Sequence, residues 1–351
     1  MREIEVQIQD VAFGGAGVAR SEGKVIFVPF TITGESVTAC ITREKKQFAQ
    51  AELGDINEAS RARVVPRCPY FGRCGGCSYQ HMSYQHQLEV KARQVEQAMR
   101  RIGRIAAPPL QPIVPSPQEY AYRNRITVHA QGGLVGYYKR DSQRLLDVER
   151  CPIAAPEVNA KLAELRARKP ADGHYTLRAH AGPRVFEQTN PAVAEALAQI
   201  VEQTLPDGHR LLIDAYCGAG FFSKRLTHKF ERVVGIEWDR YAIAVAQENT
   251  APNESYIAGD VGLALGDQLA IAEPATTSVI LDPPATGLAA GVRQALLDRP
   301  AHTLVYVSCN PTTLARDLQE LQARYTIVAI TPLDMFPQTA EIECAVHLRS
   351  V

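Results

Sequence analysis

The chain has 351 residues, and its 38 basic and 38 acidic side chains leave no formal net charge. Its hydrophobic content of 46% is ordinary for a globular protein, and no stretch has the apolar length that spans a bilayer. The first residues lack the apolar core of a signal peptide. These features exclude a membrane-spanning class and predict a cytoplasmic protein without a membrane partner.

Charge is unevenly distributed along the chain. Residues 1–60 carry a net charge of −3, residues 61–170 of +11 and residues 171–351 of −8. A segment with a net charge of +11 is typical of a polyanion-binding surface, but a solvated basic surface would have the same composition. Charge alone therefore leaves these two interpretations equal.

The first 57 residues alternate apolar and polar side chains between glycine-rich turns, which predicts short strands and a small β-barrel. A loop rich in proline, cysteine and glycine follows at 66–80. Residues 84–102 predict a helix whose apolar stripe consists of Leu88, Val95, Met99 and Ile102. After a proline-rich connection, residues 120–150 predict strands and hairpins, and 155–168 a further helix.

From residue 211 onward, buried strands alternate with helices. Five apolar strands are expected at 211–215, 233–237, 255–257, 278–281 and 303–307, with helices at 241–249 and 313–323. This alternation predicts an α/β fold with a doubly wound parallel sheet. Two final strands, 326–330 and 343–348, have no helix between them, so we expect an antiparallel end to the sheet.

Acidic and glycine residues follow the first three of these strands. Asp214–Gly220 joins the first strand to its helix, and its glycines, Gly218 and Gly220, allow a ligand to approach the backbone. Glu237 ends the second strand, where a carboxylate can accept the ribose hydroxyls, and Asp260 ends the third, near an adenine edge. The glycine pattern is shorter than the full dinucleotide fingerprint, so S-adenosylmethionine fits better than NAD.

The fourth strand ends in Asp282–Pro283–Pro284, an element similar to the Asp-Pro-Pro-aromatic element of amino-group methyltransferases. In those enzymes an aromatic ring stacks on the base, whereas here the next residue is Ala285. This difference weakens the amino-group interpretation and favours chemistry on a pyrimidine carbon.

The fifth strand ends in Ser308–Cys309–Asn310–Pro311. A thiolate that adds to carbon 6 of uracil converts carbon 5 into a nucleophile, and a base must then remove the carbon-5 proton before the thiolate leaves. Glu343, at the start of the last strand, can face the same cleft as Cys309. The alternative is a buried packing cysteine, although the turn that follows an apolar strand argues against it.

Four further cysteines, Cys68, Cys74, Cys77 and Cys151, lie in a different chemical setting. In a reducing compartment, clustered cysteines hold metal more often than they form disulfides. Their spacing fits either a four-cysteine zinc site or an iron–sulfur cluster. Small residues at Gly75 and Gly76 leave room for sulfides.

Taken together, these motifs resemble the RNA uracil-5-methyltransferases, over nearly the whole chain. The segments that carry the resemblance are 308–318 around the cysteine, Asp334–Thr339 with Glu343, Phe186–Asn190, the four cysteines, and residues 1–57, which are similar to the RNA-binding TRAM domain. The resemblance implies a Rossmann-like methyltransferase domain with an N-terminal TRAM or OB-like β-barrel and a small central iron–sulfur domain. It favours the branch that modifies 23S ribosomal RNA.

The resemblance also assigns roles. Cys309 would be the nucleophile and Glu343 the base, and the four cysteines would hold a [4Fe–4S] cluster. Residues that would bind S-adenosylmethionine are Gln188, Tyr216, Gly218, Gly220, Glu237, Asp260 and Asp282. Basic residues near the predicted hairpins, expected to contact RNA phosphates, are Arg123, Arg125, Lys139, Arg140 and Arg144.

The expected domains are 1–57 for the barrel, 58–83 with 106–182 for the central domain, and 84–105 with 183–351 for the methyltransferase domain. The chain departs from the family at Ala285, where arginine is usual, at Phe221, where asparagine is usual, and at Glu341, where histidine is common. We expect a monomer that acts on ribosomal RNA rather than tRNA. The competing hypotheses are a uridine methyltransferase for tRNA, a catalytically silent RNA-binding paralogue, and a small-molecule or amino-group methyltransferase.

Overall fold

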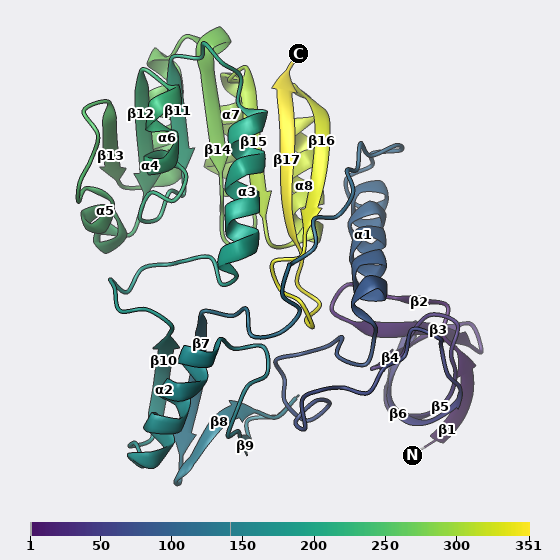
Figure 1. Cartoon of the computed structure of the whole chain (residues 1–351). Helices are drawn as coiled ribbons and strands as arrows, with labels where there is room; N and C mark the ends of the chain where they lie inside the picture. The colour runs from purple at the N-terminus through teal and green to yellow at the C-terminus, as the bar shows by residue number, and fades with distance from the viewer. Residues whose placement is uncertain (1, 141) are drawn as a thin grey trace. The chain divides into compact units, whose positions relative to one another are not determined.

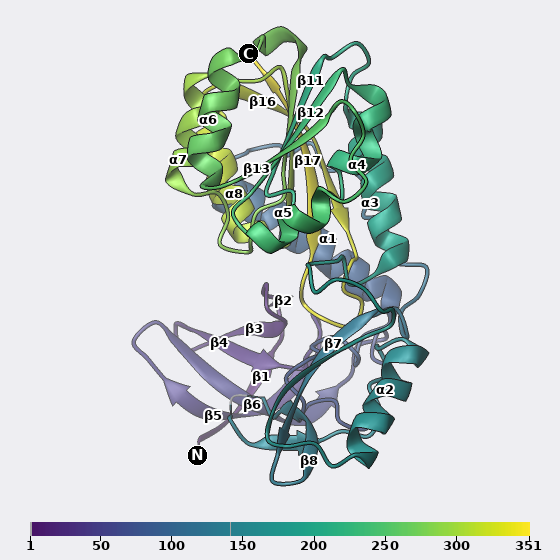
Figure 2. The same ribbon diagram turned by 90° about the vertical axis from the view of Figure 1, so that its left-hand side faces the viewer.

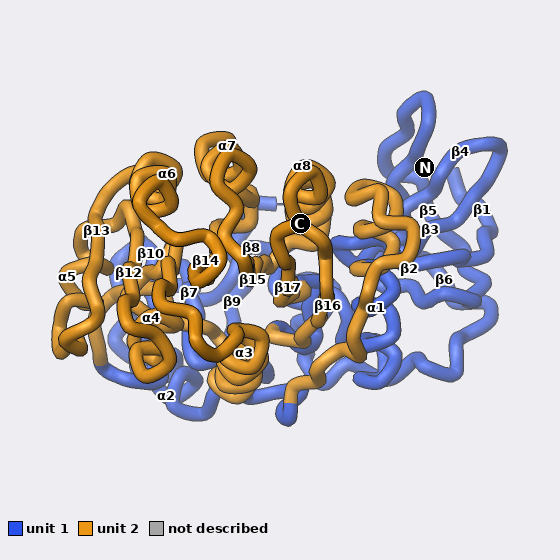
Figure 3. The backbone as a smooth tube through the Cα atoms, turned by 90° about the horizontal axis from the view of Figure 1, so that it is seen from above, with its two compact units in different colours: residues 1–94, 117–181, 336–341 blue, residues 95–116, 182–335, 342–351 orange. Residues whose placement is uncertain are grey.

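The computed structural model describes residues 2–140 and 142–351, which divide into two compact units (Figure 3). The first unit comprises Met1–Gln94, Pro117–Ala181 and Phe336–Glu341, and the second comprises Val95–Ser116, Gly182–Met335 and Ile342–Val351. The division falls within helix α1 (Tyr84–Arg101), whereas we expected this helix to belong entirely to the methyltransferase domain. It also assigns the short segment Phe336–Glu341 to the unit that contains the N-terminus.

The N-terminal part of the first unit is a six-stranded sheet in the order β1-β5-β6-β4-β3-β2 (Figure 1). Its strands are β1 (Arg2–Gln7), β2 (Asp10–Val11), β3 (Ala16–Ser21), β4 (Lys24–Pro29), β5 (Ser36–Glu44) and β6 (Phe48–Glu58). Alternate side chains along them are buried and form one apolar core. β1 and β2 lie at the two ends of this order, and the strand pairing of the described residues does not show the predicted β-barrel to be closed.

The rest of the first unit contains a four-stranded antiparallel sheet in the order β10-β7-β8-β9. Its elements are β7 (Arg125–Gln131), β8 (Leu134–Tyr138), β9 (Leu145–Asp147), α2 (Pro156–Ala167) and β10 (Gly173–Arg178). Helix α2 covers one face, where its Val158 and Leu162 pack with Ile126 and Val128 of β7. The alternate residues of β7, such as Thr127, lie on the opposite face and are exposed.

The second unit is built on a seven-stranded sheet in the order β13-β12-β11-β14-β15-β17-β16. The strands are β11 (Leu211–Ala215), β12 (Arg232–Glu237), β13 (Glu254–Ala258), β14 (Thr277–Leu281), β15 (Thr303–Ser308), β16 (Tyr325–Leu333) and β17 (Glu343–Ser350). The first five are parallel, and β17 is antiparallel to both of its neighbours. The predicted parallel sheet with an antiparallel end is therefore observed.

Helices cover both faces of this sheet (Figure 2). Helices α6 (Val261–Ile271), α7 (Ala290–Asp298) and α8 (Pro311–Leu321) lie on one face, and α3 (Pro191–Thr204) and α4 (Ser223–Leu226) lie on the other. The remaining helices are α5 (Arg240–Ala246) and the 3₁₀ turns η1 (Thr227–Lys229) and η2 (Pro274–Thr276).

The C-terminal half of α1 contributes to the core of the second unit. Val95 and Met99 are fully buried there, whereas Ile102, which we expected on the same stripe, is 39% exposed because α1 has ended at Arg101. Among the described helices, none combines the length and apolar character needed to cross a membrane.

Candidate active site and cysteine cavity

The loop after β11 places its two glycines in different surroundings. Gly218 has φ +53° and a β-carbon there would meet no atom within 4 Å, so its backbone faces open space. A β-carbon on Gly220 would lie 2.4 Å from the hydroxyl oxygen of Tyr256. Gly218 therefore leaves room for a ligand, whereas Gly220 makes room for the Tyr256 ring.

Tyr216, in the same loop, has a left-handed backbone with φ +67°, which is uncommon for a bulky side chain. Its backbone N–H donates to the carbonyl of Ile236 at 2.8 Å, which joins the loop to β12. Burial raises the pKa of the Tyr216 hydroxyl, which is also hydrogen bonded to the backbone of Ala289. Strained backbone of this kind is concentrated at ligand sites.

Glu237, the last residue of β12, is held by backbone amides. Its Oε1 accepts from the N–H groups of Trp238 at 2.9 Å and Asp239 at 3.0 Å, and its Oε2 accepts from the N–H of Gly218 at 3.2 Å. A carboxylate has about four acceptor positions in all. In this conformation Oε2 retains one position for an incoming hydroxyl, so Glu237 both fixes the glycine loop and stays able to bind a ligand.

Asp260 follows β13 and caps helix α6, because its Oδ1 accepts from the N–H of Leu263 at 2.9 Å. The residues beside these two acids are unusually exposed for apolar side chains: Trp238 is 74% exposed and Leu263 is 74% exposed. Sequence reasoning missed Trp238, although the only tryptophan of the chain directly follows the acid that ends a strand. Apolar surface of this kind beside acceptor groups is suited to a nucleoside.

Two carboxyl groups at this edge have raised pKa values. Asp214 is fully buried, its Oδ2 accepts from the N–H and hydroxyl of Ser223, and burial raises its pKa to about 7. Burial also raises the pKa of Asp282 well above its usual range, and the neighbouring Asp214 raises it further. Acidic groups perturbed in this way are concentrated at functional sites.

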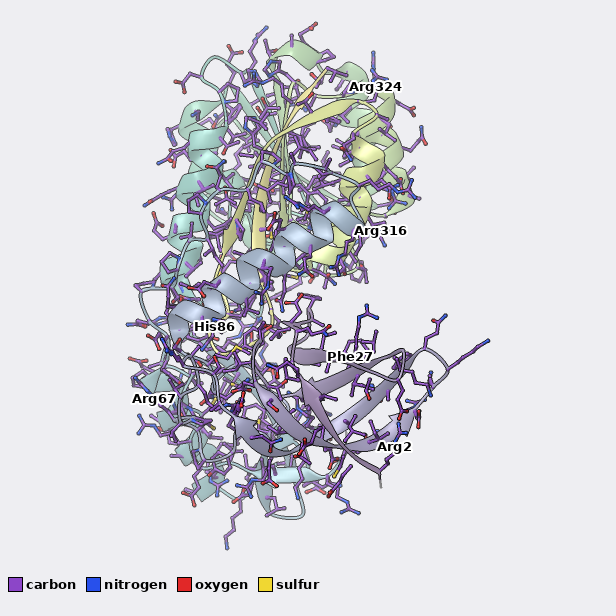
Figure 4. All side chains as sticks on the ribbon, turned by 90° about the vertical axis from the view of Figure 1, so that its right-hand side faces the viewer. Arg2, Phe27, Arg67, His86, Arg316 and Arg324 are labelled. Atoms are coloured by element: carbon purple, nitrogen blue, oxygen red, sulfur yellow. The ribbon has the colours of Figure 1, made fainter. Side chains whose placement is uncertain are left out.

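The segment after Asp282–Pro283–Pro284 is fixed by side chains of helix α8. Thr313 Oγ1 donates to the carbonyl of Ala285 at 2.9 Å, and Arg316 Nη2 donates to the carbonyl of Thr286 at 3.0 Å (Figure 4 labels Arg316). These bonds involve backbone atoms of the loop. Residue 285 is alanine here, where the family usually has arginine, and its backbone carbonyl can still accept the hydrogen bond from Thr313.

Asp317 completes this support from a fully buried position. Its Oδ2 accepts from the N–H of Leu288 at 2.8 Å and from the hydroxyl of Tyr306 at 2.8 Å, and its Oδ1 accepts from Arg316. Thr313, Arg316 and Asp317, in the run after Cys309, thus shape the neighbouring strand-end loop, a role that the sequence alone did not reveal.

Cys309 and Glu343 are brought together by strand register. β15 and β17 pair antiparallel with Ser308 opposite Cys344, so the next position along each strand holds Cys309 on one side and Glu343 on the other. Directly opposed residues on antiparallel strands have side chains on the same face. Cys309 is partly exposed, whereas Glu343 is 3% exposed.

The turn after Cys309 is built by a helix cap. Asn310 begins α8, and its side-chain oxygen accepts from the N–H groups of Thr312 at 3.0 Å and Thr313 at 3.4 Å. Pro311 occupies the first helical position, where no N–H is needed. The Ser-Cys-Asn-Pro sequence is therefore a strand end followed by a helix start, with the thiol at the junction.

Gln188 lies on the connection before α3 and is 9% exposed, beside two other buried polar residues, Thr189 and Asn190. Asn190 caps α3 by accepting from the N–H of Val193, and its amide donates to Ser116 at 3.0 Å. The asparagine of this element thus holds the connection in place.

In the first unit, the four cysteines Cys68, Cys74, Cys77 and Cys151 line one cavity of about 410 Å³. None of them forms a disulfide. Burial raises the pKa of the Cys77 thiol to about 12 and raises the pKa values of Cys68 and Cys74, with neighbouring cysteines adding to the effect. Within residues 2–140 and 142–351, no three His, Cys, Asp or Glu side chains are grouped as they would be around a single metal ion.

The predicted RNA-contacting residues do not share one setting. Arg123 and Arg125 line the cysteine cavity, together with Arg150 and Arg178. Arg140 lies over the Phe30 ring at 4.6 Å, and its backbone N–H donates to Arg73. Lys139 and Arg144 are exposed.

A doubly wound sheet with a glycine loop and acids at the carboxyl ends of its strands defines a protein of the methyltransferase class. Comparison with known proteins agrees. The family model described as tRNA (Uracil-5-)-methyltransferase matches residues 177–258 and 266–351, and the TRAM domain model matches residues 1–53.

Relatives align along almost the whole chain. An uncharacterized RNA methyltransferase of Protochlamydia amoebophila is 31% identical, over 99% of this chain and 98% of its own length. A 23S rRNA (uracil(1939)-C(5))-methyltransferase of Acidithiobacillus ferrooxidans is 30% identical, over 97% of this chain and 96% of its own. The chain belongs to the RNA uracil-5-methyltransferase family, as its motifs predicted.

Among solved structures, the tRNA (uracil-54, C5)-methyltransferase of Pyrococcus abyssi, determined with S-adenosyl-L-homocysteine, has the same fold. Its TM-score is 0.76, with 23% sequence identity over 98% of this chain and 99% of that one. The likeness extends over both compact units.

Proposed function

We propose that the protein transfers a methyl group from S-adenosylmethionine to carbon 5 of a uridine in RNA, with Cys309 as nucleophile and Glu343 as base. The register of β15 and β17 is the observation that carries this proposal, because its last pair is Ser308–Cys344 and the residues one step further, at one sheet edge, are Cys309 and Glu343. The same edge carries Glu237 and Gly218, which suit the adenosyl part of the cofactor.

Cys309 adds through its sulfur to carbon 6 of the uracil, which makes carbon 5 electron-rich. S-adenosylmethionine supplies the electrophilic methyl group. Glu343 then takes the proton from carbon 5, the carbon 5–carbon 6 double bond re-forms, and the bond between Cys309 and carbon 6 breaks. The uridine must leave its stack to reach the thiol, at a cost of roughly a few kcal/mol.

Covalent trapping tests this assignment. Fluorine at carbon 5 removes the proton that Glu343 abstracts, so RNA with 5-fluorouridine is expected to stay bonded to the protein. Cys309→Ala is expected to abolish this adduct, and Cys40→Ala, at a partly exposed cysteine of the N-terminal sheet, is expected to leave it unchanged. Glu343→Gln is expected to accumulate an adduct with ordinary RNA. An adduct that survives Cys309→Ala would contradict the assignment of the nucleophile.

We propose 23S ribosomal RNA as the substrate rather than tRNA. Support comes from the ribosomal RNA methyltransferase that aligns with 97% of this chain, whereas the similar tRNA enzyme shares 23% identity. Mass mapping of 5-methyluridine in RNA from cells with and without the gene separates the two substrates. Loss of the modification from tRNA alone would contradict the proposal.

We propose that Cys68, Cys74, Cys77 and Cys151 hold a [4Fe–4S] cluster. All four thiols line one cavity, and their spacing resembles the iron–sulfur site of the ribosomal branch of the family. Protein purified without oxygen is expected to be brown and to contain about four irons per chain. Stoichiometric zinc without iron would favour the single-ion site instead.

We propose that Arg123, Arg125, Lys139, Arg140 and Arg144 contact RNA phosphates. Each lost contact should weaken RNA binding and reduce the slope of log affinity against log salt concentration by about 0.7–0.9. Arg140 should show the smallest change, because its guanidinium already lies over Phe30. Unchanged slopes in all five alanine variants would show that this segment is not the RNA surface.

A further inference from the structure

The segment Phe336–Glu341 connects β16 to β17 and belongs to the first compact unit, although both strands belong to the second. Glu343 follows this segment after a single intervening residue, Ile342. Ala340 packs in an apolar cluster of the first unit with Tyr79, Met82 and Val90. The chain therefore enters β17 directly from a segment whose own contacts lie within the first unit.

One of these contacts is a reciprocal pair of glutamines. Gln338 Oε1 accepts from Gln87 Nε2 at 3.0 Å, and Gln87 Oε1 accepts from the backbone N–H of Gln338 at 3.0 Å. Gln87 lies on α1 and is fully buried, and Gln338 is 1% exposed. Gln338 also has φ +70°, a strained conformation that surrounding bonds must maintain.

Three consecutive carbonyls of the segment are also bonded. Phe336 accepts from Lys91 Nζ at 3.0 Å, and Pro337 accepts from the hydroxyl of Tyr122 at 2.9 Å. Gln338 accepts from the N–H groups of Ser78 and Tyr79, both at 3.0 Å, and these two residues directly follow Cys77. One residue thus joins helix α1, the cysteine loop and the segment that leads to the base.

We propose that Gln87 is a positioning residue for the elimination step, acting through Gln338 on the placement of Glu343; this inference rests on the proposed function. Cys309 directly follows β15, which ends at Ser308, and does not follow the anchored segment, so attack on carbon 6 does not depend on Gln87. Proton removal from carbon 5 does depend on it. A displacement of about 1 Å at a reacting group can slow a step about 100-fold.

Gln87→Ala tests the proposal, with Gln94→Ala as its matched control. Gln94 is a buried glutamine on the same helix, but its side chain donates to the carbonyls of Val11 and Ala12 and to Tyr79, not to the segment before Glu343. Gln87→Ala is expected to accumulate the covalent adduct with ordinary RNA and to lower kcat about 10- to 100-fold. RNA affinity and the yield of adduct with 5-fluorouridine RNA should stay unchanged, and Gln94→Ala should turn over normally.

A second variant covers the case in which Gln87→Ala does not fold. Gln338→Gly removes the bond from Gln87 Nε2 to the Gln338 side chain, leaves the backbone N–H bond to Gln87, and tolerates the positive φ; it is expected to accumulate adduct to a smaller extent than Gln87→Ala. Normal turnover by both variants, with adduct accumulating in Glu343→Gln, would overturn the role of Gln87 alone. Failure of Glu343→Gln to accumulate adduct would overturn the base assignment and this inference with it.

A separate observation concerns the four-stranded sheet of the first unit. On the face that α2 does not cover, three rings lie together: His129 of β7 is 4.3 Å from Tyr138 of β8 and 4.5 Å from His174 of β10, between ring centroids. Tyr138 is 38% exposed and His174 is exposed. The buried Nδ1 of His129 has no hydrogen-bond partner among the described residues.

Two arginines lie further along the same face. Arg125 and Arg178 are directly paired across β7 and β10, four register steps from the His129–His174 pair and two beyond the Thr127–Thr176 pair. Asp172 accepts from the N–H of Gly132 at the other end of the same strands. Rings at one end of a face and paired arginines further along it match a single-stranded polynucleotide, whose bases stack and whose phosphates are anionic.

We infer that His129, Tyr138 and His174 form a stacking platform for a base of single-stranded RNA, which deepens the proposed function by adding a subsite away from the reacting uridine. Tyr138→Ala and His174→Ala are expected to weaken binding of a single-stranded oligonucleotide about tenfold without changing its salt dependence, while Tyr138→Phe retains affinity. Arg178→Ala should instead reduce the salt slope. Unchanged affinity in Tyr138→Ala, or an equal loss with duplex RNA, would overturn the platform but leave the methyl-transfer assignment intact.

Discussion

At the carboxyl ends of the strands in the seven-stranded sheet, the loops after β12 and β13 form one half and the loops after β14 and β15 form the other. These two halves are stabilised in opposite ways. At the ends of β12 and β13, acidic side chains accept mainly from backbone N–H groups of the loops that follow them, as Glu237 does from Trp238 and Asp239, with one further bond from Gly218 of the β11 loop. After β14 the arrangement is reversed, because the backbone of the loop 285–288 is held by side chains of α8. The first half therefore depends on local sequence, and the second depends on a helix that follows in the chain.

This difference explains which residues tolerate change. In the half formed by the ends of β12 and β13, the acid itself makes the supporting bonds, so its replacement affects the loop as well as any ligand bound there. In the half formed by the ends of β14 and β15, Thr313, Arg316 and Asp317 support a loop whose own side chains are free to vary. Ala285 is a departure from the family that this support accommodates.

The largest effect is expected for Asp317→Ala. The substitution leaves Arg316 without its buried partner and removes the acceptor of the Leu288 N–H and the Tyr306 hydroxyl. Removing one partner of a buried charged pair lowers the free energy of unfolding by about 3–5 kcal/mol. Chemical denaturation measures this cost, and Glu320→Ala, which removes a surface ion pair with Arg293, should change it by less than about 1 kcal/mol. Similar losses in both variants would show that the loop does not depend on α8.

The sequence predicted the sheet well because its strands are runs of apolar residues, and the structure observes their alternation with helices. It also predicted that Cys309 and Glu343 lie near strand ends, and the antiparallel register of β15 and β17 brings those strand ends together. It predicted the short strands of the N-terminal sheet but not their order, because that order depends on pairing between distant strands. Nor did it predict the Gln87–Gln338 pair, whose members are 251 positions apart and carry no chemical signature of their own.

A glycine of the supported loop gives a sharper test of the comparison. Gly287 has φ +81°, and a β-carbon there would lie 2.5 Å from Asp317 Oδ2 and 2.6 Å from Arg316 Nη2. Gly287→Ala therefore adds a steric clash to backbone strain, and we expect a loss of about 2–3 kcal/mol.

Gly208→Ala is the matched control for this variant. Gly208 has φ +82°, but a β-carbon there would meet no atom within 4 Å. The expected loss is then about 1 kcal/mol, from backbone strain alone. Equal losses in thermal or chemical unfolding would mean that α8 yields to the added methyl group, and that its support of the loop is weaker than proposed.

In the half formed by the loops after β12 and β13, Glu237→Gln is the informative substitution. An amide retains one acceptor oxygen, so at least one of the three N–H donors from Gly218, Trp238 and Asp239 loses its partner. We expect affinity for S-adenosylmethionine, measured by calorimetry, to fall about tenfold, with a loss of stability of about 1–2 kcal/mol. An alanine at Asp239, the N-cap of α5, should lower stability by about 1 kcal/mol with a smaller effect on affinity.

Asp282 lies where the two halves meet, and its titration tests how they are coupled. Burial raises the pKa values of Asp214 and Asp282 above those of the unfolded chain, so between about pH 4 and pH 7 the unfolded state binds fewer protons than the folded state. Stability should therefore fall as pH rises through this range. Below about pH 4 both states are protonated, and the penalty disappears.

Asp282→Asn removes one of the two titrating groups. The fall in unfolding free energy between pH 4 and pH 7 should shrink by about 1–2 kcal/mol, because the asparagine has no charge to bury and no longer opposes ionisation of Asp214. The exposed Asp298, changed to Asn, should leave the pH profile unaltered. Since Asp282 is also a proposed cofactor contact, the variant should be more stable at neutral pH and yet bind S-adenosylmethionine less tightly. A variant that gains stability without losing affinity would place Asp282 among the supports of the edge instead of among its ligands.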